Sequence, residues 1–287
     1  MNTTNATYRF INTTSFVMGN RKNAGKTTFM NWALNQIRKV EAPAFATIGI
    51  DGESHDQIDG RDKPLIKTEP GDVFITSYPM LRKSSGLFKV EKAFQIKTPL
   101  GQLVVAKTLR SGTIELVGPE YNEQLKHLID FIRLELNYRS IVIDGAASRL
   151  TPVSAIANSG FYYVVNIDRR NMKKTLEQMQ LLSISADFEL ASQDDDAFVV
   201  EGALTPGKLS SIPRDCQTVV INDLTAIFLN YEQLQHLQKR VTIKVVNRPV
   251  LKGFVAVLKD IAQEAFSQLY MSKGIRTELI LNPYVHQ

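Results

Sequence analysis

The apolar residues follow two patterns that alternate along the chain, one typical of buried strands and one typical of helices. Short apolar runs rich in branched side chains predict buried strands near 15–19, 45–50, 140–143, 161–167, 197–201, 217–221, 241–246 and 276–281. Apolar residues at helical spacing between these runs predict helices near 26–39, 120–136, 171–184, 230–239 and 251–270. Strands that alternate with helices are typical of an α/β fold, in which a mostly parallel sheet carries helices on both faces.

Residues 62–118 depart from this alternation. They contain strand-like runs separated by Gly and Pro turns, at 72–78, 89–98, 102–109 and 113–119. The segment Thr98–Gln102 between two of these runs is typical of a hairpin turn. We therefore expect one domain over residues 1–287, interrupted by a β-rich insertion that forms an antiparallel extension or a small subdomain.

A polar loop near the start of the chain connects the first predicted strand to the first predicted helix. The loop places Gly-Lys-Thr at the start of the helix, and its residues are Asn20, Arg21, Lys22, Asn23, Ala24, Gly25, Lys26, Thr27 and Thr28. The N–H groups at a helix N-terminus point at a bound anion, and the helix dipole adds to the attraction. This context predicts a phosphate-binding loop.

The residue types in the loop suit this chemistry. Gly25 lets the backbone approach a phosphate, Lys26 reaches the β- and γ-phosphates, and Thr27 ligates Mg²⁺. The sequence departs from the consensus G-x-x-x-x-G-K-[ST], because Asn20 stands at the position of the first glycine. Asparagine tolerates left-handed backbone angles better than most residues, so the departure weakens the prediction without removing it. The alternative is a basic surface turn before a Thr-rich helix start.

A carboxylate at the end of a neighbouring strand is the second part of such a site. Asp144 follows the apolar run Ser140–Ile143 and precedes Gly145. Phosphate-loop proteins use an acid in this position to hold Mg²⁺, whereas Asp-Gly by itself is also a strong turn dipeptide. Because ligands of parallel sheets bind at the carboxyl ends of strands, we expect Asp144 and the loop to meet in one site.

The loop resembles the deviant phosphate loops of the class that includes signal-recognition proteins, partitioning ATPases and dethiobiotin synthetase. These loops carry a signature lysine five residues before the motif lysine, where this chain has Arg21, followed by Lys22. The resemblance implies that Asp51, after the second strand, is a catalytic or Mg²⁺-linked residue, with Glu53 as second choice and solvated loop carboxylates as the alternative. It also implies a base contact by Asn247 on a late strand, and the missing guanine signature Asn-Lys-x-Asp favours ATP.

The amino-acid composition indicates which partners and which cellular compartment to expect. The 287 residues carry a net charge of +5, and the spread of Lys and Arg along the chain gives no clear indication of nucleic acid binding. The apolar runs are too short to cross a membrane, and residues 1–16 lack the pattern of a secretory signal. A single cysteine, Cys216, fits a reducing compartment. We therefore expect a cytoplasmic protein without a membrane partner.

The phrases GNRKNAGKTT, ATIGIDGE, IDGAASR, NDLTAIFL and LILNPY occur in this order along the chain. Together they resemble the P-loop subunit of the reactivase for lysine 5,6-aminomutase, a cobalamin-dependent enzyme. In that family the subunit works with a MutS-like ATPase partner. The resemblance implies hydrolysis of ATP, with Mg²⁺, that drives exchange of damaged cobalamin from an inactivated mutase. It gives nucleotide roles to Lys26, Thr27, Asp51 and Asp144, and it assigns no cobalamin contact.

Three functions from different classes remain open. The first is an NTPase whose hydrolysis changes a partner protein, with Lys26 and Mg²⁺ stabilising charge and Asp51 orienting the attacking water. The second is a small-molecule kinase or an ATP-dependent ligase of the dethiobiotin-synthetase type, with residues 62–118 supplying a substrate pocket. The third is a nucleotide-gated interaction module. Many proteins of this class work as dimers, so a homodimer is a further expectation.

Overall fold

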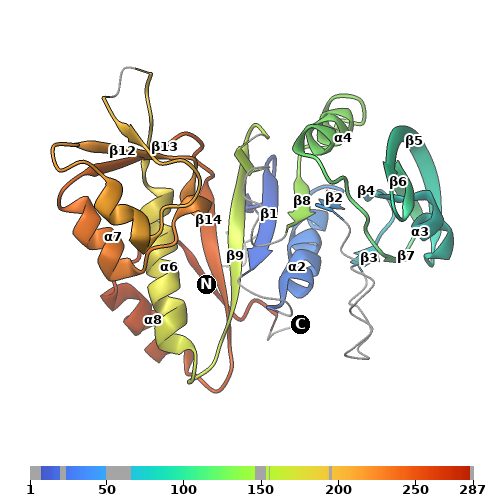
Figure 1. Ribbon diagram of the computed structural model, residues 1–287. Helices are drawn as coiled ribbons and strands as arrows, with labels where there is room; N and C mark the ends of the chain where they lie inside the picture. Colours follow the sequence, from blue (N-terminus) through green and yellow to red (C-terminus); the bar gives the residue numbers. More distant parts are fainter. Residues whose placement is uncertain are drawn as a thin grey trace. The chain divides into compact units, whose positions relative to one another are not determined.

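The computed structural model describes residues 8–19, 24–49, 66–145, 153–154, 156–193 and 196–284. The chain forms two compact units, a first unit of Met1–Ser159 with Pro283–Gln287 and a second unit of Gly160–Asn282. Both units combine parallel strands with helices, which confirms the α/β class with mostly parallel strands (Figure 1). The single domain expected over residues 1–287 stays a prediction.

Four neighbouring strands of the first unit are parallel. Their order in the sheet is β1, β8, β2 and β4, with the bounds Thr14–Gly19, Ile141–Asp144, Ala44–Thr47 and Val73–Ser77. Each strand pairs in parallel with the next in this order. Every residue of the four strands is buried, which explains why their sequences are continuous apolar runs rather than alternating ones.

Helix α2 (Lys26–Arg38) follows β1 and confirms the helix predicted near 26–39. Its buried stripe includes Phe29, Trp32 and Ile37. The Phe29 and Trp32 rings stack with their centroids 5.4 Å apart, and the Phe10 ring meets Phe29 edge-on at 6.0 Å. Aromatic pairs in these geometries stabilise a core beyond the area that they bury, so the start of the chain helps to fix α2 against the sheet.

The predicted β-rich insertion contains an antiparallel extension of this sheet. Strand β6 (Gly101–Arg110) pairs antiparallel with β4, and β5 (Leu87–Thr98) pairs antiparallel with β6. The hairpin turn predicted at Thr98–Gln102 connects β5 to β6. Gly101 in this turn has φ +110°, a conformation that glycine adopts without the steric cost of a side chain.

The described part of the first unit also contains two helices and two short strands. They are β3 (Ile66–Thr68), α3 (Tyr78–Lys83), β7 (Gly112–Ile114) and α4 (Asn122–Leu134). Strand β3 pairs antiparallel with β7 in a separate two-stranded sheet. Helix α4 confirms the helix predicted near 120–136, because it buries the predicted stripe residues Leu125, Leu128, Ile129 and Ile132.

The second unit has two groups of parallel strands. One has the order β15, β14, β9, with the bounds Leu279–Leu281, Leu251–Leu258 and Ser159–Ile167. The other has the order β10, β13, β12, β11, with the bounds Glu189–Leu190, Thr242–Val245, Thr218–Ile221 and Phe198–Val199. The longer helices are α6 (Met172–Ala186), α7 (Tyr231–Gln238) and α8 (Gln263–Ser272). Across the described parts of both units, no helix has the length and apolar character that crossing a membrane requires.

The helix predicted near 251–270 is wrong over its first part, residues 251–258. The structure has strand β14 at 251–258, followed by helix α8. β14 lies between β9 and β15, so its central residues are buried on both faces and form an apolar run without alternation. A run of this kind has no period that separates a buried strand from a buried helix. Asp260, with φ +56°, lies in the connection between the two elements.

Candidate functional site

Asp144 lies between the carboxyl ends of two parallel strands. Its register partners are Val17 on β1 and Thr47 on β2. The Asp144 carbonyl oxygen accepts hydrogen bonds from the Ile48 N–H at 3.0 Å and from the Thr47 hydroxyl at 3.2 Å. On the other side, the Gly145 N–H donates to the Val17 carbonyl at 3.0 Å. The backbone at Asp144 is therefore held by both neighbouring strands.

The Asp144 side chain is a buried carboxylate at this edge of the sheet. Asp144 is 6% exposed, and Gly145 follows it directly. Oxygen atoms of carboxylates and hydroxyls are the protein ligands that Mg²⁺ prefers, and Mg²⁺ is usually held by one or two carboxylates together with phosphates and waters. Among the described residues no group of three or more His, Cys, Asp or Glu could hold a metal ion.

The predicted phosphate loop ends at a helix start with a left-handed N-cap residue. Gly25 is the N-cap of α2 and has φ +96° and ψ +16°, a left-handed conformation. The Phe29 N–H donates to the Gly25 carbonyl at 2.9 Å, so the helix begins directly after Gly25. A side chain at this position would strain the backbone, which explains the glycine in physical terms.

The first turn of α2 carries a lysine and no acidic residue. Gly25 has no side chain that could cap the first N–H groups of the helix, and the first turn contains no acidic residue. Lys26 is the first residue of the helix, where its positive charge lies at the positive end of the helix dipole. Both features cost stability in the absence of an anion, and a bound anion would offset both.

The loop residues differ in their exposure. Ala24 is buried, Lys26 and Thr27 are partly exposed, and Thr28 is exposed. The buried Ala24 anchors the end of the loop, while Lys26 and Thr27 remain accessible to a ligand. β1 and α2 are consecutive elements of the described chain, and α2 contacts both β1 and β8. We therefore expect Gly25, Lys26 and Thr27 at the same edge of the sheet as Asp144.

Several predicted site residues lie outside the described residues. These are the loop residues Asn20, Arg21, Lys22 and Asn23, and the acid Asp51 with its second choice Glu53. Their roles stay predictions.

The chain that leads toward Asp51 is fixed by contacts that the sequence did not reveal. Beyond β2, the Gly49 N–H donates to the Pro119 carbonyl at 2.8 Å, and the Gly118 N–H donates to the Gly49 carbonyl at 3.1 Å. Gly118 lies so close to β2 that a Cβ built on it would be 1.8 Å from the Thr47 carbonyl oxygen. The Gly-Pro pair at 118–119 was visible as the end of a strand-like run, but nothing in the sequence linked it to residue 49.

Asn247, the predicted base contact, belongs to the second unit. It follows β13 and donates from its side-chain amide to the Asn222 side-chain oxygen at 3.2 Å. The Asn222 amide donates in turn to the Asp223 carboxylate at 3.0 Å, and Asp223 is almost fully buried. The Asn247 amide is therefore part of a polar network at the carboxyl ends of β12 and β13. Its contact with a base stays a prediction.

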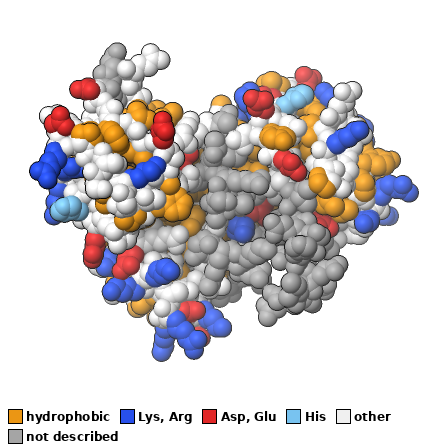
Figure 2. Space-filling model, viewed as in Figure 1, with side chains coloured by type: hydrophobic (Ala, Val, Ile, Leu, Met, Phe, Trp, Pro, Cys, Tyr) orange, Lys and Arg blue, Asp and Glu red, His pale blue; other side chains and the backbone are white. Residues whose placement is uncertain are grey.

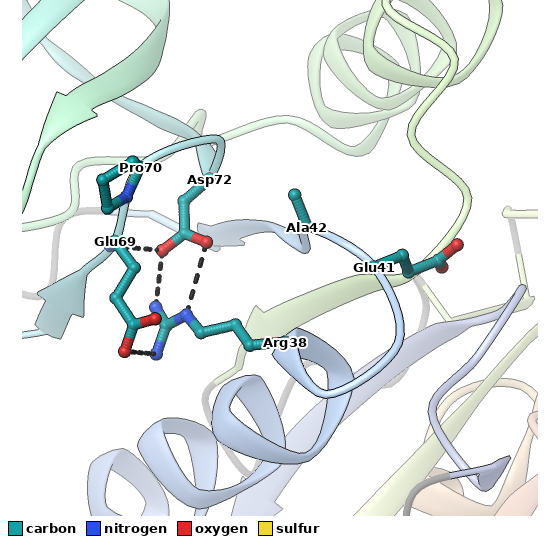
Figure 3. A pocket seen from close by; sticks show the side chains of 6 residues that line it. All are labelled: Arg38, Glu41, Ala42, Glu69, Pro70 and Asp72. Atoms are coloured by element: carbon teal, nitrogen blue, oxygen red, sulfur yellow. Dashed lines mark hydrogen bonds and ion pairs between the residues drawn. The ribbon is translucent and has the colours of Figure 1, made fainter.

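The cavity in Figure 3 is a different kind of polar site. It has a volume of about 130 Å³, and the residues drawn around it are Arg38, Glu41, Ala42, Glu69, Pro70 and Asp72. The Arg38 guanidinium donates to both carboxylate oxygens of Asp72, from Nε at 3.3 Å and from an Nη at 2.5 Å. Burial raises the pKa of the Asp72 carboxyl, while the hydrogen bond and charge of Arg38 lower it.

This cavity lies at the opposite ends of the strands from Asp144. Residues 41 and 42 lead into β2, and Asp72 directly precedes β4, so both lie at amino ends of strands. The Arg38 side chain is nearly buried and also donates to the Lys67 carbonyl at 2.9 Å. Its position in the last turn of α2 suits the negative end of the helix dipole. We interpret the Arg38–Asp72 pair as a structural tie between α2 and the start of β4.

Comparison of the chain with protein-family models found none that matches it, and comparison with curated proteins found no match either. The functional argument therefore depends on the residues at the carboxyl ends of β1, β8 and β2.

Proposed function

We propose that the protein is a P-loop NTPase of the deviant class that binds ATP with Mg²⁺ at the carboxyl ends of β1, β8 and β2. One observation carries the proposal. The buried Asp144 lies beside β1, and the same strand leads through the loop to a helix start with a left-handed Gly25 and a lysine at its first position. A basic surface turn would need neither the left-handed glycine nor a buried acid on the adjacent strand.

The residues have distinct roles in this proposal. The N–H groups after Gly25 bind phosphate oxygens, and Lys26 neutralises the β- and γ-phosphates. Thr27 and Asp144 would hold Mg²⁺, which supplies neutralisation of the phosphate charge when it is bound. The donor set fits this ion because both side chains offer oxygen. Asp51 would orient the attacking water, and Asn247 would contact adenine.

The remaining loop residues and the partners also belong to the proposal. Asn20, Lys22, Asn23, Ala24 and Thr28 would complete the cradle, with Arg21 in the position of the signature lysine. Hydrolysis would drive a change in a partner protein, and the sequence resemblance favours reactivation of a cobalamin-dependent aminomutase together with a MutS-like ATPase. We place this activity in the cytoplasm and expect a homodimer.

Measurements of ATP turnover and of nucleotide binding test the proposal together. Purified protein is assayed for Mg²⁺-dependent release of phosphate from ATP, alone and with an aminomutase and its MutS-like partner. Lys26→Ala is expected to lower turnover by about 100-fold or more, because charge neutralisation by the loop lysine is a main source of catalysis in this class. Lys39→Ala is the matched control, since Lys39 directly follows the opposite end of α2 and its ammonium donates to the Gln36 side chain.

The outcomes separate the candidate functions. Hydrolysis that is slow alone and faster with the partner supports the NTPase. Transfer of phosphate to a metabolite in a substrate screen, with little hydrolysis, would instead support the kinase or ligase of the dethiobiotin-synthetase type. Full binding and turnover in Lys26→Ala would refute the site.

A further inference from the structure

Strand β5 is an edge strand. It lies at the end of the strand order of its sheet, and it pairs with β6 on its inner side. No described strand pairs with its outer side. β5 is twelve residues long, which is long for an edge strand, and its register with β6 shifts at several points along this length. The outer backbone N–H and C=O groups of an edge strand are a template for pairing with another polypeptide.

The segment around β5 concentrates the positive charge of the protein. Residues 78–113 contain seven Lys and Arg residues and a single acid, Glu91, which gives a net charge of +6. The whole chain has a net charge of +5, so all other residues together sum to −1. The seven basic residues belong to α3, β5 and β6 rather than to one run. The sequence alone therefore did not show that they lie in one part of the fold.

Two of these lysines face each other across the hairpin. Lys89 on β5 and Lys107 on β6 are direct register partners. Like charges in directly opposite positions destabilise a strand pair. The Lys89 ammonium pairs with the Glu91 carboxylate at 2.9 Å, and the Lys89 side chain is still 61% exposed. Glu91 neutralises Lys89, and a further anion from another molecule would neutralise Lys107.

Aliphatic side chains lie exposed beside these charges. Leu87 and Val90 on β5 are 52% and 37% exposed, and Leu109 on β6 is 50% exposed. Leu109 is next to Leu87 in the hairpin, since Leu87 pairs with Arg110 and Phe88 pairs with Thr108. Figure 2 shows hydrophobic side chains beside Lys and Arg side chains on the side where Figure 1 draws β5 and β6. The surface is thus both apolar and basic.

The aromatic rings of β5 are engaged in packing. Phe94 is buried, and its ring meets the Phe131 ring of α4 edge-on at 5.4 Å. The Phe88 ring meets the buried Phe74 ring edge-on at 5.3 Å. Single-stranded nucleic acids bind by stacking their bases on exposed aromatic rings, which β5 does not offer. The combination of an open strand edge, exposed aliphatic residues and lysines fits a protein segment better than a nucleic acid.

We propose that β5 docks an extended, acidic segment of a partner protein, which adds a strand to the sheet. Main-chain hydrogen bonds to the outer edge of β5 would hold the segment, and its carboxylates would face Lys89 and Lys107. Aliphatic side chains on the other face of the segment would cover Val90, which lies on the opposite face of β5 from Lys89. This interaction goes beyond the proposed nucleotide site, and it needs no nucleotide.

Fluorescence anisotropy with labelled probes tests the proposal on the full chain without nucleotide. The main probe is a peptide of alternating Glu and Val with about the length of β5, since strand addition matches main-chain groups along the edge. A peptide of alternating Lys and Val tests the charge. The acidic peptide with N-methyl groups on every second backbone nitrogen tests the hydrogen bonds, because it keeps the side chains and loses donors. An oligothymidylate of similar length tests nucleic acid.

The expected result is that the acidic peptide binds and the other three probes bind at least about tenfold more weakly. Lys89→Glu with Lys107→Glu should weaken binding of the acidic peptide by about tenfold or more. Lys173→Glu with Lys174→Glu, two exposed lysines on α6, should leave it unchanged. Hydrogen exchange of the wild-type protein should slow in β5 when the acidic peptide is bound.

Three results would overturn the proposal. One is equal binding of the N-methylated peptide, which would reduce the interaction to unspecific charge attraction. Another is preferred binding of the oligothymidylate, which would assign this face to nucleic acid. The third is the absence of any preference for the acidic peptide over the basic one.

Discussion

Asp144 on β8 and Val17 on β1 are direct register partners, and the Gly145 N–H donates to the Val17 carbonyl at 3.0 Å. The acid therefore lies on β8, the strand that pairs directly with β1, and β1 leads into the predicted phosphate loop. Val17 precedes the last residue of β1, Gly19, by only two positions. The end of β1 and the acid therefore have a separation that depends on backbone hydrogen bonds rather than on flexible side chains.

Gly25→Ala tests whether the left-handed helix start serves the ligand. The substitution should cost about 1–2 kcal/mol of stability, because φ +96° is unfavourable for a residue with a side chain. It should also abolish or strongly weaken nucleotide binding. Gly202→Ala is the matched control, since Gly202 also has positive φ, +69°, and has open space around it. Denaturant unfolding and nucleotide titration of both variants check this, and equal binding losses would contradict the prediction.

Gly118→Ala tests the main-chain contacts between the β-rich extension and the end of β2. A Cβ at this position would be 1.8 Å from the Thr47 carbonyl oxygen, so the 118–119 segment must move away from Gly49. We expect a loss of about 2 kcal/mol or more, in the range of substitutions that force backbone shifts. Thermal unfolding measures the loss. Gly207→Ala, where a Cβ would meet only the Thr205 hydroxyl at 3.9 Å, should change the melting temperature little.

Arg38→Met tests the structural interpretation of the cavity in Figure 3. Removal of the guanidinium leaves the buried Asp72 carboxylate without its cation, which should cost about 3–5 kcal/mol. Lys126→Met removes the cation of the exposed Lys126–Asp130 pair and should cost less than about 0.5 kcal/mol. Urea unfolding of the two variants gives both values. A similar small loss in both would show that the Arg38 pair does not hold α2 to β4.

The buried Lys252 side chain should make the stability of the folded protein depend on pH. Burial lowers the pKa of its ammonium from 10.5 to about 8. Above pH 8 the folded state releases this proton while the unfolded state still binds it, so the free energy of unfolding should rise with pH from about 8 to 9.5. Near pH 10 the opposite effect begins, because burial raises the pKa of the Tyr163 hydroxyl to about 12.

The variant Lys252→Met tests whether Lys252 causes this pH dependence. Urea unfolding at pH 7 and pH 9.5 should show a gain of stability for the wild-type protein and a smaller gain, or none, for Lys252→Met. Equal pH profiles of the two proteins would mean that Lys252 titrates at its ordinary value in the folded state.

The sequence predicted the elements at the candidate site better than it predicted the contacts between them. β1, α2 and β8 each have a local signal: a bounded apolar run, a helical stripe or an acid before glycine. β14 was missed because a strand buried on both faces loses its alternation. The bonds of Gly49 with Gly118 and Pro119 join residues far apart in the sequence through main-chain atoms alone, which leave no signature in side-chain type.

The Mg²⁺ dependence of ATP binding by the wild-type protein and by Asp144→Asn tests the central claim most directly. A fluorescent ATP analogue is titrated with and without Mg²⁺, and thermal unfolding confirms that the variant is folded. The wild-type protein should bind more tightly with Mg²⁺, and Asp144→Asn should lose that gain while it keeps the weaker binding that Lys26 and the loop provide. Equal Mg²⁺-dependent binding by the two proteins would contradict the assignment of Asp144 and of the site around it.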